Sequence, residues 1–197
     1  QGNFKGSDLK GVDLRFAILI GADLSNANLS GANFSGANLS GANLSNTNLN
    51  GTRLNRSNLS GANLEGADLR NKHLTGANLS GVDLSNQDLT GTSLHYVNLS
   101  GVNLDGVDLR NKNLTGANLS GVDLSNKDLT GTNLTFTNLS GVNLEGADLR
   151  NKNLTGANLS GVDLSNQDLT GTNLTFTNLS GVNLDGVDLR NKNLTGA

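Results

Sequence analysis

Seven aspartates recur every twenty residues and are the most regular set of ionisable groups in the chain. They are Asp68, Asp88, Asp108, Asp128, Asp148, Asp168 and Asp188. Stacked in one column by a repetitive fold, they would suit either of two functions: a stripe that mimics nucleic-acid phosphates, or a row of Ca²⁺ ligands. Neighbouring carboxylates about 4.8 Å apart would repel each other by about 1 kcal/mol in water, so the column needs compensating charge.

Arginine supplies that charge in alternate repeats. Arg70, Arg110, Arg150 and Arg190 each lie two residues after an aspartate of the column, whereas Glu65, Asp105, Glu145 and Asp185 add acid on the preceding segment. The whole chain carries a net charge of −3. It therefore lacks the excess of basic residues that is typical of nucleic-acid-binding proteins, and it is only mildly acidic. The sequence therefore favours a self-neutralised face over a phosphate mimic or a Ca²⁺ row.

The residue types needed for catalysis are scarce. The two histidines, His73 and His95, do not recur in later copies, cysteine is absent, and the periodic glycines lack the Gly-Lys-Ser/Thr of a phosphate-binding loop. A catalytic or zinc site needs singular residues that converge in a pocket. The sequence therefore predicts no enzyme, no metal, no cofactor and no small-molecule substrate.

The elements that must position these residues follow a strict five-residue period. From Phe4 to Leu194 every fifth residue is Leu or Phe, a spacing that fits neither a helix nor a flat strand. Gly or Asn follows most of these residues by two positions, and both tolerate the positive φ of tight turns. The period predicts short extended segments joined by corners.

The repeat resembles the pentapeptide-repeat family, whose unit reads A(D/N)LXX, and Ala117-Asn118-Leu119-Ser120-Gly121 is a representative copy. The resemblance covers the whole chain. It implies an all-β fold, a right-handed quadrilateral parallel β-helix with four pentapeptides per coil and the Leu and the residue two before it facing inward. About ten coils would make a rod of roughly 50 Å, with no α-helical cap.

A longer period of forty residues lies over the first. Residues 111–150 and 151–190 differ only at Lys127/Gln167, Glu145/Asp185 and Ala147/Val187. Residues 71–110 are a related copy, 191–197 begin another, and 1–70 keep only the five-residue rule. We expect one solenoid domain over 1–197, with a varied start followed by duplications.

Lysine replaces Ala or Val at the second inward position in several repeats: Lys72, Lys112, Lys127, Lys152 and Lys192. Asn precedes each of them, which indicates a changed corner. Because an unpaired buried ammonium costs several kcal/mol, we expect these structural corners to swing the lysines outward or let them snorkel. There they would help to neutralise the aspartate column.

Large residues alternate with glycine at one corner. Phe16, Arg56, Tyr96, Phe136 and Phe176 occupy it in every second coil, and Gly36, Gly76, Gly116 and Gly156 occupy it between them. We expect the rings to fold over the glycine corners; the alternative is a shallow ridge for a partner. A single Thr column runs beside them, flanked by Asn rather than by a second Thr row, which speaks against ice binding.

The candidate interaction surface is thus the aspartate column with Arg110 and Arg150, together with Tyr96, Phe136 and Phe176. The leading function is a non-catalytic structural or protein-interaction rod that belongs to a longer array or stacks end to end. Family members that mimic DNA and bind type II topoisomerases offer an alternative, from which this chain departs by its interleaved Arg and Lys. An ice- or Ca²⁺-binding solenoid is a further alternative.

The expected partners are a protein or further copies of the chain, rather than nucleic acid or a membrane. No apolar run approaches the roughly 20 residues of a membrane span. The sequence starts without Met or a signal peptide, so its start is a processed end or a fragment boundary, and the localisation is left open.

Overall fold

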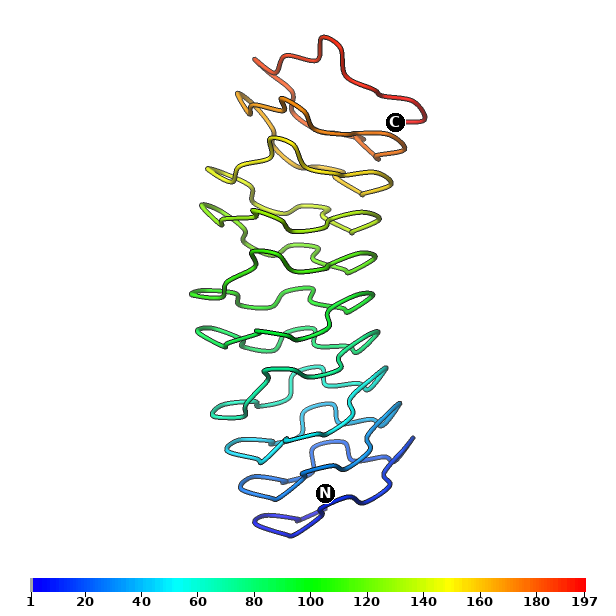
Figure 1. Cartoon of the computed structure of the whole chain (residues 1–197), viewed down its shortest axis with the longest axis vertical. Helices are drawn as coiled ribbons and strands as arrows, with labels where there is room; N and C mark the ends of the chain where they lie inside the picture. Colours follow the sequence, from blue (N-terminus) through cyan, green and yellow to red (C-terminus); the bar gives the residue numbers. More distant parts are fainter. Residues whose placement is uncertain (1) are drawn as a thin grey trace. The chain divides into compact units, whose positions relative to one another are not determined.

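The computed structural model describes residues 2–197; Gln1 lies outside the described residues. The chain divides into two compact units, Gln1–Val107 and Asp108–Ala197, which we call unit 1 and unit 2 and describe separately. Each unit is a stack of coils (Figure 1). Over residues 2–197 there is no helix, and the strands are reduced to isolated single-residue bridges.

Parallel bridges join residues twenty apart and therefore define the coil. In unit 1, Asn38 pairs with Asn58; the Leu39 amide donates to the Asn58 carbonyl at 2.7 Å, and the Asn58 amide donates to the Ala37 carbonyl at 2.8 Å. A turn bond closes each corner, as from the Ala37 amide to the Phe34 carbonyl at 2.9 Å. Four five-residue segments per coil agree with the solenoid expected from the sequence.

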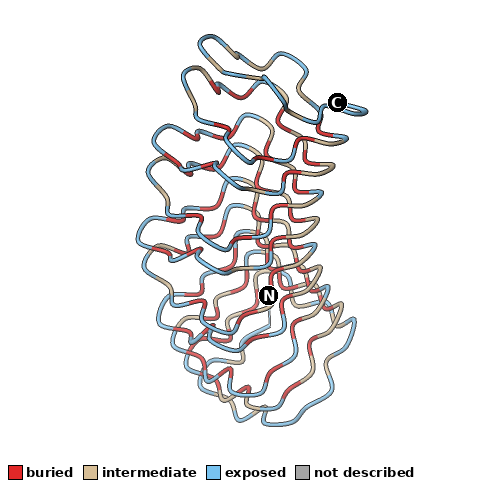
Figure 2. Ribbon diagram, turned by 45° about the horizontal axis from the view of Figure 1, so that its top comes forward, coloured by how far each residue is buried: buried red, intermediate tan, exposed pale blue. Residues whose placement is uncertain are grey.

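The core of each unit is a column of leucines. Leu119, Leu124 and Leu129 are fully buried, and the neighbouring inward position holds buried Ala117 and Val122. Figure 2 shows this buried inner lining against exposed corners. Burying one leucine contributes about 1.5–3 kcal/mol before entropy, so a chain with very few aromatics still has a continuous core.

The corners have left-handed backbone. Gly121 has φ 68°, and corners that lack Gly keep the same conformation, with φ 56° at Asn126 and 58° at Phe136. Asn tolerates this region and Phe does so only under strain. The solenoid geometry therefore overrides the preference of Phe.

Pairing between coils is uneven around the coil. We call Asn118, Asn138, Asn158 and Asn178 the Asn column of unit 2; it is bridged at every described step, whereas the aspartate column has no bridge from Asp68 onward within either unit. The segments between these two columns are bridged at alternate steps, for example Asn113 to Asn133 and Asn153 to Asn173. On each side of the aspartate column in unit 2, bridged (tight) steps thus alternate with unbridged (wide) ones, and the two sides are out of phase: Asp123 and Asn143 are bridged in the step where Asn133 and Asn153 are not. The aspartate column itself is unbridged at every step of unit 2.

Residues 2–197 contain no helix of the length and hydropathy that a membrane span requires.

Candidate functional site

The aspartate column contains two kinds of carboxylate. In every second coil an arginine of the same coil binds the aspartate: the Arg110 and Arg150 guanidiniums lie 2.8 Å from Asp108 and Asp148. Asp68–Arg70 and Asp188–Arg190 repeat the pair at 2.8 and 2.6 Å. The guanidinium Nε and NH2 groups bind both carboxylate oxygens, the fork geometry that gives Arg its preference for carboxylates.

The intervening aspartates accept hydrogen bonds from threonine. The Thr170 amide donates to Asp168 at 2.8 Å and its hydroxyl at 2.5 Å, and the Thr130 amide donates to Asp128 at 2.9 Å. In unit 1, Thr90 binds Asp88 in the same way. Ion-paired and threonine-bound carboxylates therefore alternate along the column.

These bonds hold the column ionised. The hydrogen bond from the Arg110 side chain, and then that from its backbone amide, lower the pKa of Asp108 to about 2, and Arg70 lowers the pKa of Asp68 to about 2. The pKa of Asp168 is lowered chiefly by the Thr170 hydroxyl and amide. The lysines add a smaller attraction, as Lys72 does on Asp68. The expected self-neutralised face agrees with these contacts.

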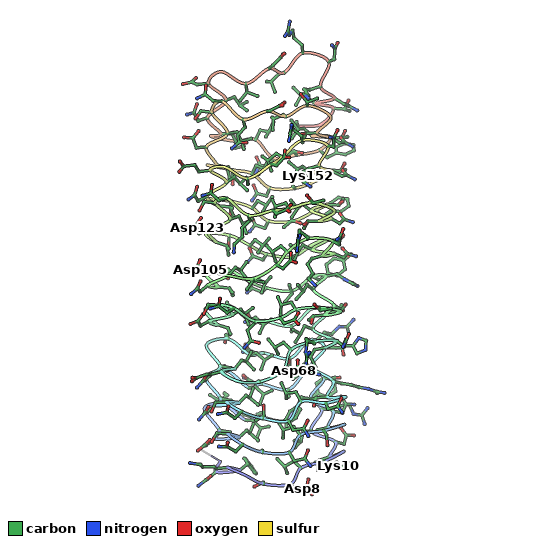
Figure 3. The ribbon with its side chains drawn as sticks, turned by 60° about the vertical axis from the view of Figure 1, so that its left-hand side comes forward. Asp8, Lys10, Asp68, Asp105, Asp123 and Lys152 are labelled. Carbon is green, nitrogen blue, oxygen red and sulfur yellow. The ribbon has the colours of Figure 1, made fainter. Side chains whose placement is uncertain are left out.

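The expectation that the lysines swing outward is wrong. Lys72 is only 6% exposed and Lys152 is half-buried (Lys152 is labelled in Figure 3). The Lys152 ammonium donates to the Leu129 carbonyl at 2.6 Å, and Lys192 makes the equivalent bond to Leu169. Backbone carbonyls have a second lone pair free after the turn bond, so the inward ammonium is satisfied.

Shorter side chains make the same contact at the other steps of unit 2. The Thr132 hydroxyl donates to the Leu109 carbonyl at 2.8 Å and the Thr172 hydroxyl to Leu149 at 2.7 Å. Each of these donors lies 23 residues after its acceptor, as Lys152 does after Leu129. Thr therefore spans the tight step and Lys the wide step, which explains a period of two coils.

The same substitution accounts for the open aspartate column. Where the inward positions hold small residues, such as Ser7 and Ala27, the bridge from Asp8 to Asn28 forms. The bridge from Asn28 to Asn48 also forms, with Thr47 inward, but from Asp68 onward, where Lys or Gln enters one inward position of each coil, no bridge of this column forms within either unit. A longer side chain between two coils holds their backbones apart, since its tip must fit beneath the carbonyl that it binds.

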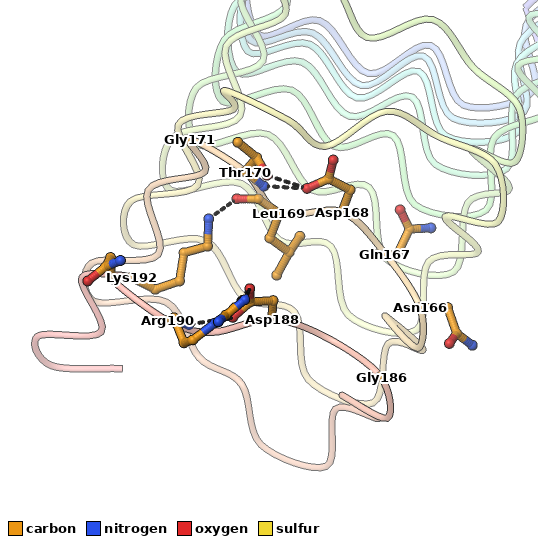
Figure 4. Close-up of a pocket in the computed structure, with 11 residues that line it drawn as sticks. Asn166, Gln167, Asp168, Leu169, Thr170, Gly171, Gly186, Asp188, Arg190 and Lys192 are labelled. Atoms are coloured by element: carbon orange, nitrogen blue, oxygen red, sulfur yellow. Dashed lines mark hydrogen bonds and ion pairs between the residues drawn. The ribbon is translucent and has the colours of Figure 1, made fainter.

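The wide steps leave open cavities beside the aspartate column. One of about 520 Å³ in unit 2 is lined by residues that include Asp168, Thr170, Asp188, Arg190 and Lys192 (Figure 4). A similar one in unit 1, of about 600 Å³, includes Asp68, Arg70, Lys72 and Asp88. Sequence reasoning missed these openings; the appearance of Lys and Gln at inward positions from Lys72 onward was the signal that could have revealed them.

The aromatic residues fold over glycine corners, as the sequence predicts. A Cβ on Gly36 would lie 2.6 Å from the Phe16 ring, and one on Gly156 or Gly196 would overlap the ring of Phe136 or Phe176. The rings still expose 62% at Phe136 and Phe176 and 65% at Tyr96. Asparagine corners use the same device, with the Asn111 amide over Gly131.

The described residues offer no cluster of side chains for a metal ion. Within residues 2–197 no three His, Asp or Glu side chains are grouped to hold a metal ion. The His95 Nε2 lies 3.4 Å from the Ser93 hydroxyl, and its buried Nδ1 has no partner. The column can form ion pairs and hydrogen bonds with another macromolecule.

A comparison with protein-family models identifies the repeat. The family model for pentapeptide repeats matches eight copies, over residues 3–36, 37–71, 73–111, 113–151, 153–186 and 177–197. The comparison with curated protein sequences gave no match.

Solved structures of pentapeptide repeat proteins resemble the chain along nearly its whole length. One is HetL, involved in heterocyst differentiation regulation in the cyanobacterium Nostoc sp. strain PCC 7120, at 36% identity over 98% of this chain and 78% of that one, with a TM-score of 0.28. Another is a trypsin-treated form of QnrB1, a plasmid-mediated fluoroquinolone resistance protein, at 24% identity over 99% and 90%, with a TM-score of 0.38.

Proposed function

Because the chain belongs to the pentapeptide-repeat family, we propose that it is a non-catalytic scaffold that binds proteins through repeated outward faces. The proposal covers one solenoid of about ten coils without a helical cap. Its partners are proteins, further copies of the chain included, rather than nucleic acid, a membrane or a small-molecule substrate.

The observation that carries this proposal is the alternation along the aspartate column. Ion pairs such as Asp108–Arg110 and Asp148–Arg150 recur forty residues apart, with a threonine-bound carboxylate between them. Repeated donors and acceptors at a fixed spacing present the same contact several times. A partner with its own repeated groups then gains affinity from simultaneous contacts.

Mimicry of DNA and a Ca²⁺ row fit the same column less well. A DNA mimic needs an uncompensated row of negative charge. In this column Arg70, Arg110 and Arg150 each pair with one aspartate, so every second carboxylate is neutralised. A row of Ca²⁺ sites fits less well because the threonine-bound carboxylates already accept two hydrogen bonds at one oxygen, as Asp168 does.

Site-specific photo-cross-linking in the producing cells tests the proposal. A photoreactive residue at Thr130 and, separately, at Thr170 lies at equivalent places forty residues apart, so both positions should give an adduct with the same protein. The same photoreactive residue at the buried position of Leu129 serves as the negative control. No protein adduct at either threonine, or adducts with nucleic acid alone, would overturn the proposal.

A further inference from the structure

Two arginines of unit 1 differ from every other arginine among residues 2–197 because they have no carboxylate partner. Arg15 and Arg70, like the three arginines of unit 2, each form an ion pair with the aspartate two residues before them. Arg53 and Arg56 have no aspartate at that position and form no ion pair within the described residues. Two positive charges are therefore left uncompensated on one short segment.

These arginines share one face of unit 1, and the corner beside it, with both histidines and the single tyrosine of the chain. The outward column of Arg53 continues through His73 and Ser93, and parallel bridges join the three residues. The Ser93 hydroxyl lies 3.0 Å from the Thr75 hydroxyl and 3.4 Å from the His95 Nε2. We call the following residues the Arg–His cluster: Arg53, Arg56, His73, His95 and Tyr96.

The basic side chains of the cluster converge on one coil. The Arg56 amide donates to the Thr75 carbonyl at 3.0 Å, and a Cβ on Gly76 would lie 3.2 Å from the Arg56 Cγ, so this side chain leans over the coil that contains His73. Arg53 is bridged to His73, and bridged neighbours lie about 4.8 Å apart. All three basic residues are exposed. Both guanidiniums can therefore bind one anion over this coil.

The cluster is not required by the fold. In unit 2 the column of Arg53 and His73 holds only asparagine, and the column of His95 holds only threonine. Asparagine also occupies the first of these columns at Asn33, inside unit 1. A chain that repeats its outward residues almost everywhere departs from the repeat here, at positions where the solenoid accepts a small polar residue. The cluster therefore marks a specific contact.

The charge of the cluster matches a single phosphate monoester. Such a group carries about −1.5 to −2 charges near pH 7 and has three acceptor oxygens, and a guanidinium binds two oxygens at once. Arg53 and Arg56 supply the two positive charges. A nucleic acid would need cations along the whole face, whereas the column is flanked by Asn33 before Arg53 and by Ser93 after His73.

Exposed aromatic side chains lie on either side of Arg56 along the corner. Phe16 lies two coils before it and Tyr96 two coils after it, 78% and 65% exposed, and Ile18 beside Phe16 is 80% exposed. Two coils span roughly 9.6 Å, the length of about three residues of extended chain. A peptide laid along this corner would therefore have an apolar side chain about three residues from its phosphate on each side.

We propose that the Arg–His cluster binds a phosphorylated side chain in an extended segment of a partner protein. Arg53 and Arg56 bind the phosphate, His73 adds a donor, and Phe16 and Tyr96 contact apolar residues on either side. This deepens the scaffold function proposed above and rests on it, because the partner is again a protein. The contact occurs once per chain, unlike the repeated contacts of the aspartate column.

An oriented peptide library tests the proposal on the full chain. Its members carry phosphoserine, phosphothreonine or phosphotyrosine at the centre of degenerate flanks, and a second library carries the unmodified residues. We expect the chain to retain the phosphopeptides about tenfold better or more, since the charge-assisted bonds need the phosphate. The retained peptides should be enriched in apolar residues three positions from the centre.

Matched charge variants locate the site. Arg53→Gln with Arg56→Gln should weaken binding of the retained phosphopeptides about tenfold or more in fluorescence anisotropy, because two charge-assisted contacts are lost. Lys5→Gln with Lys10→Gln removes the same charge from other exposed positions of unit 1 and should change the affinity little. All four side chains are exposed, so the fold is kept, which circular dichroism checks.

Competition identifies the source of the anion. Inorganic phosphate, an oligothymidylate and the same peptide with glutamate at its centre should each displace the phosphopeptide far less well than the unlabelled phosphopeptide does. Equal displacement by any of the three, equal effects of the two double variants, or no preference for the phosphopeptide library would overturn the inference. Protein adducts from Thr130 without phosphopeptide binding would overturn it while leaving the scaffold function intact.

Discussion

The ammonium nitrogen of Lys152 donates a 2.6 Å hydrogen bond to the carbonyl oxygen of Leu129, which lies in the preceding coil. At the next step Thr172 makes the equivalent bond to Leu149 at 2.7 Å with a much shorter side chain. On this side of the aspartate column, the long and short donors coincide with alternating unbridged and bridged steps in unit 2. Two coils, or forty residues, are therefore the smallest unit that repeats its own packing.

The Lys152 bond is expected to contribute to stability. Hydrogen bonds to charged groups contribute about 1.5–3 kcal/mol, so Lys152→Ala should lower the free energy of unfolding by about 1.5 kcal/mol in urea melts. Lys152→Thr retains a donor of the kind found at Thr172 and should lose less. Lys10→Ala, at an exposed position, is the control and should change little. Equal losses for the Ala and Thr variants of Lys152 would contradict the role of the donor.

The contact between Phe136 and Gly156 should appear as an energetic coupling. Gly156→Ala meets the Phe136 ring and also places a side chain at φ 67°, whereas Gly121→Ala at φ 68° meets nothing within 4 Å. The left-handed conformation costs about 1–2 kcal/mol for a residue with a Cβ. We expect Gly121→Ala to show that cost alone and Gly156→Ala to show more.

Removal of the Phe136 ring separates the cost of the left-handed backbone from the cost of the clash with the ring. In a Phe136→Gly background, which leaves no side chain over the corner, the cost of Gly156→Ala should fall toward that of Gly121→Ala in thermal or urea melts. An unchanged cost in that background would mean that the ring is not packed over the glycine.

Much of this packing follows from the sequence, and some of it does not. The period places every Leu inward, and the alternation of Phe136 with Gly156 predicts a ring over a vacant corner. The direction of Lys152 was predicted wrongly, because burial cost was weighed without the free lone pair of the Leu129 carbonyl. Sequence periodicity specifies which column a residue occupies, but not whether a long flexible side chain finds an acceptor there. The open steps depend on that choice and were missed with it.

Acid should weaken the fold in a defined window of pH. The pKa of Asp108 in the folded chain is about 2, below its ordinary 3.8, because Arg110 binds the charged form. Its contribution is therefore fully present above about pH 4 and is lost as pH falls toward 2. Asp108→Asn should reduce the loss of stability over that window, measured by circular dichroism during acid titration. A carboxyl pKa of Asp108 at or above 3.8, measured by NMR, would contradict the ion pair.

Cations should have little effect while the arginines are present. Arg110 and Arg150 neutralise Asp108 and Asp148, which are every second carboxylate in this part of the column. Ca²⁺ should therefore raise the melting temperature no more than Na⁺ at equal ionic strength. Arg110→Gln with Arg150→Gln uncovers adjacent carboxylates and should make the melting temperature rise with Ca²⁺. A specific Ca²⁺ response of the unaltered chain would support a cation row instead.

Residue-resolved amide hydrogen exchange tests the alternating, one-sided pairing of the coils most directly. In unit 2 the Leu139 amide donates to Asn158 at 2.7 Å and the Asn151 amide to Thr170 at 2.8 Å. The Leu129 and Gly131 amides, at the wide step of the aspartate column, make no backbone bond within unit 2. We expect strong protection at Leu139 and Asn151 and rapid exchange at Leu129 and Gly131. Equal protection at all four amides would contradict the open aspartate column and the spacing role of the lysines.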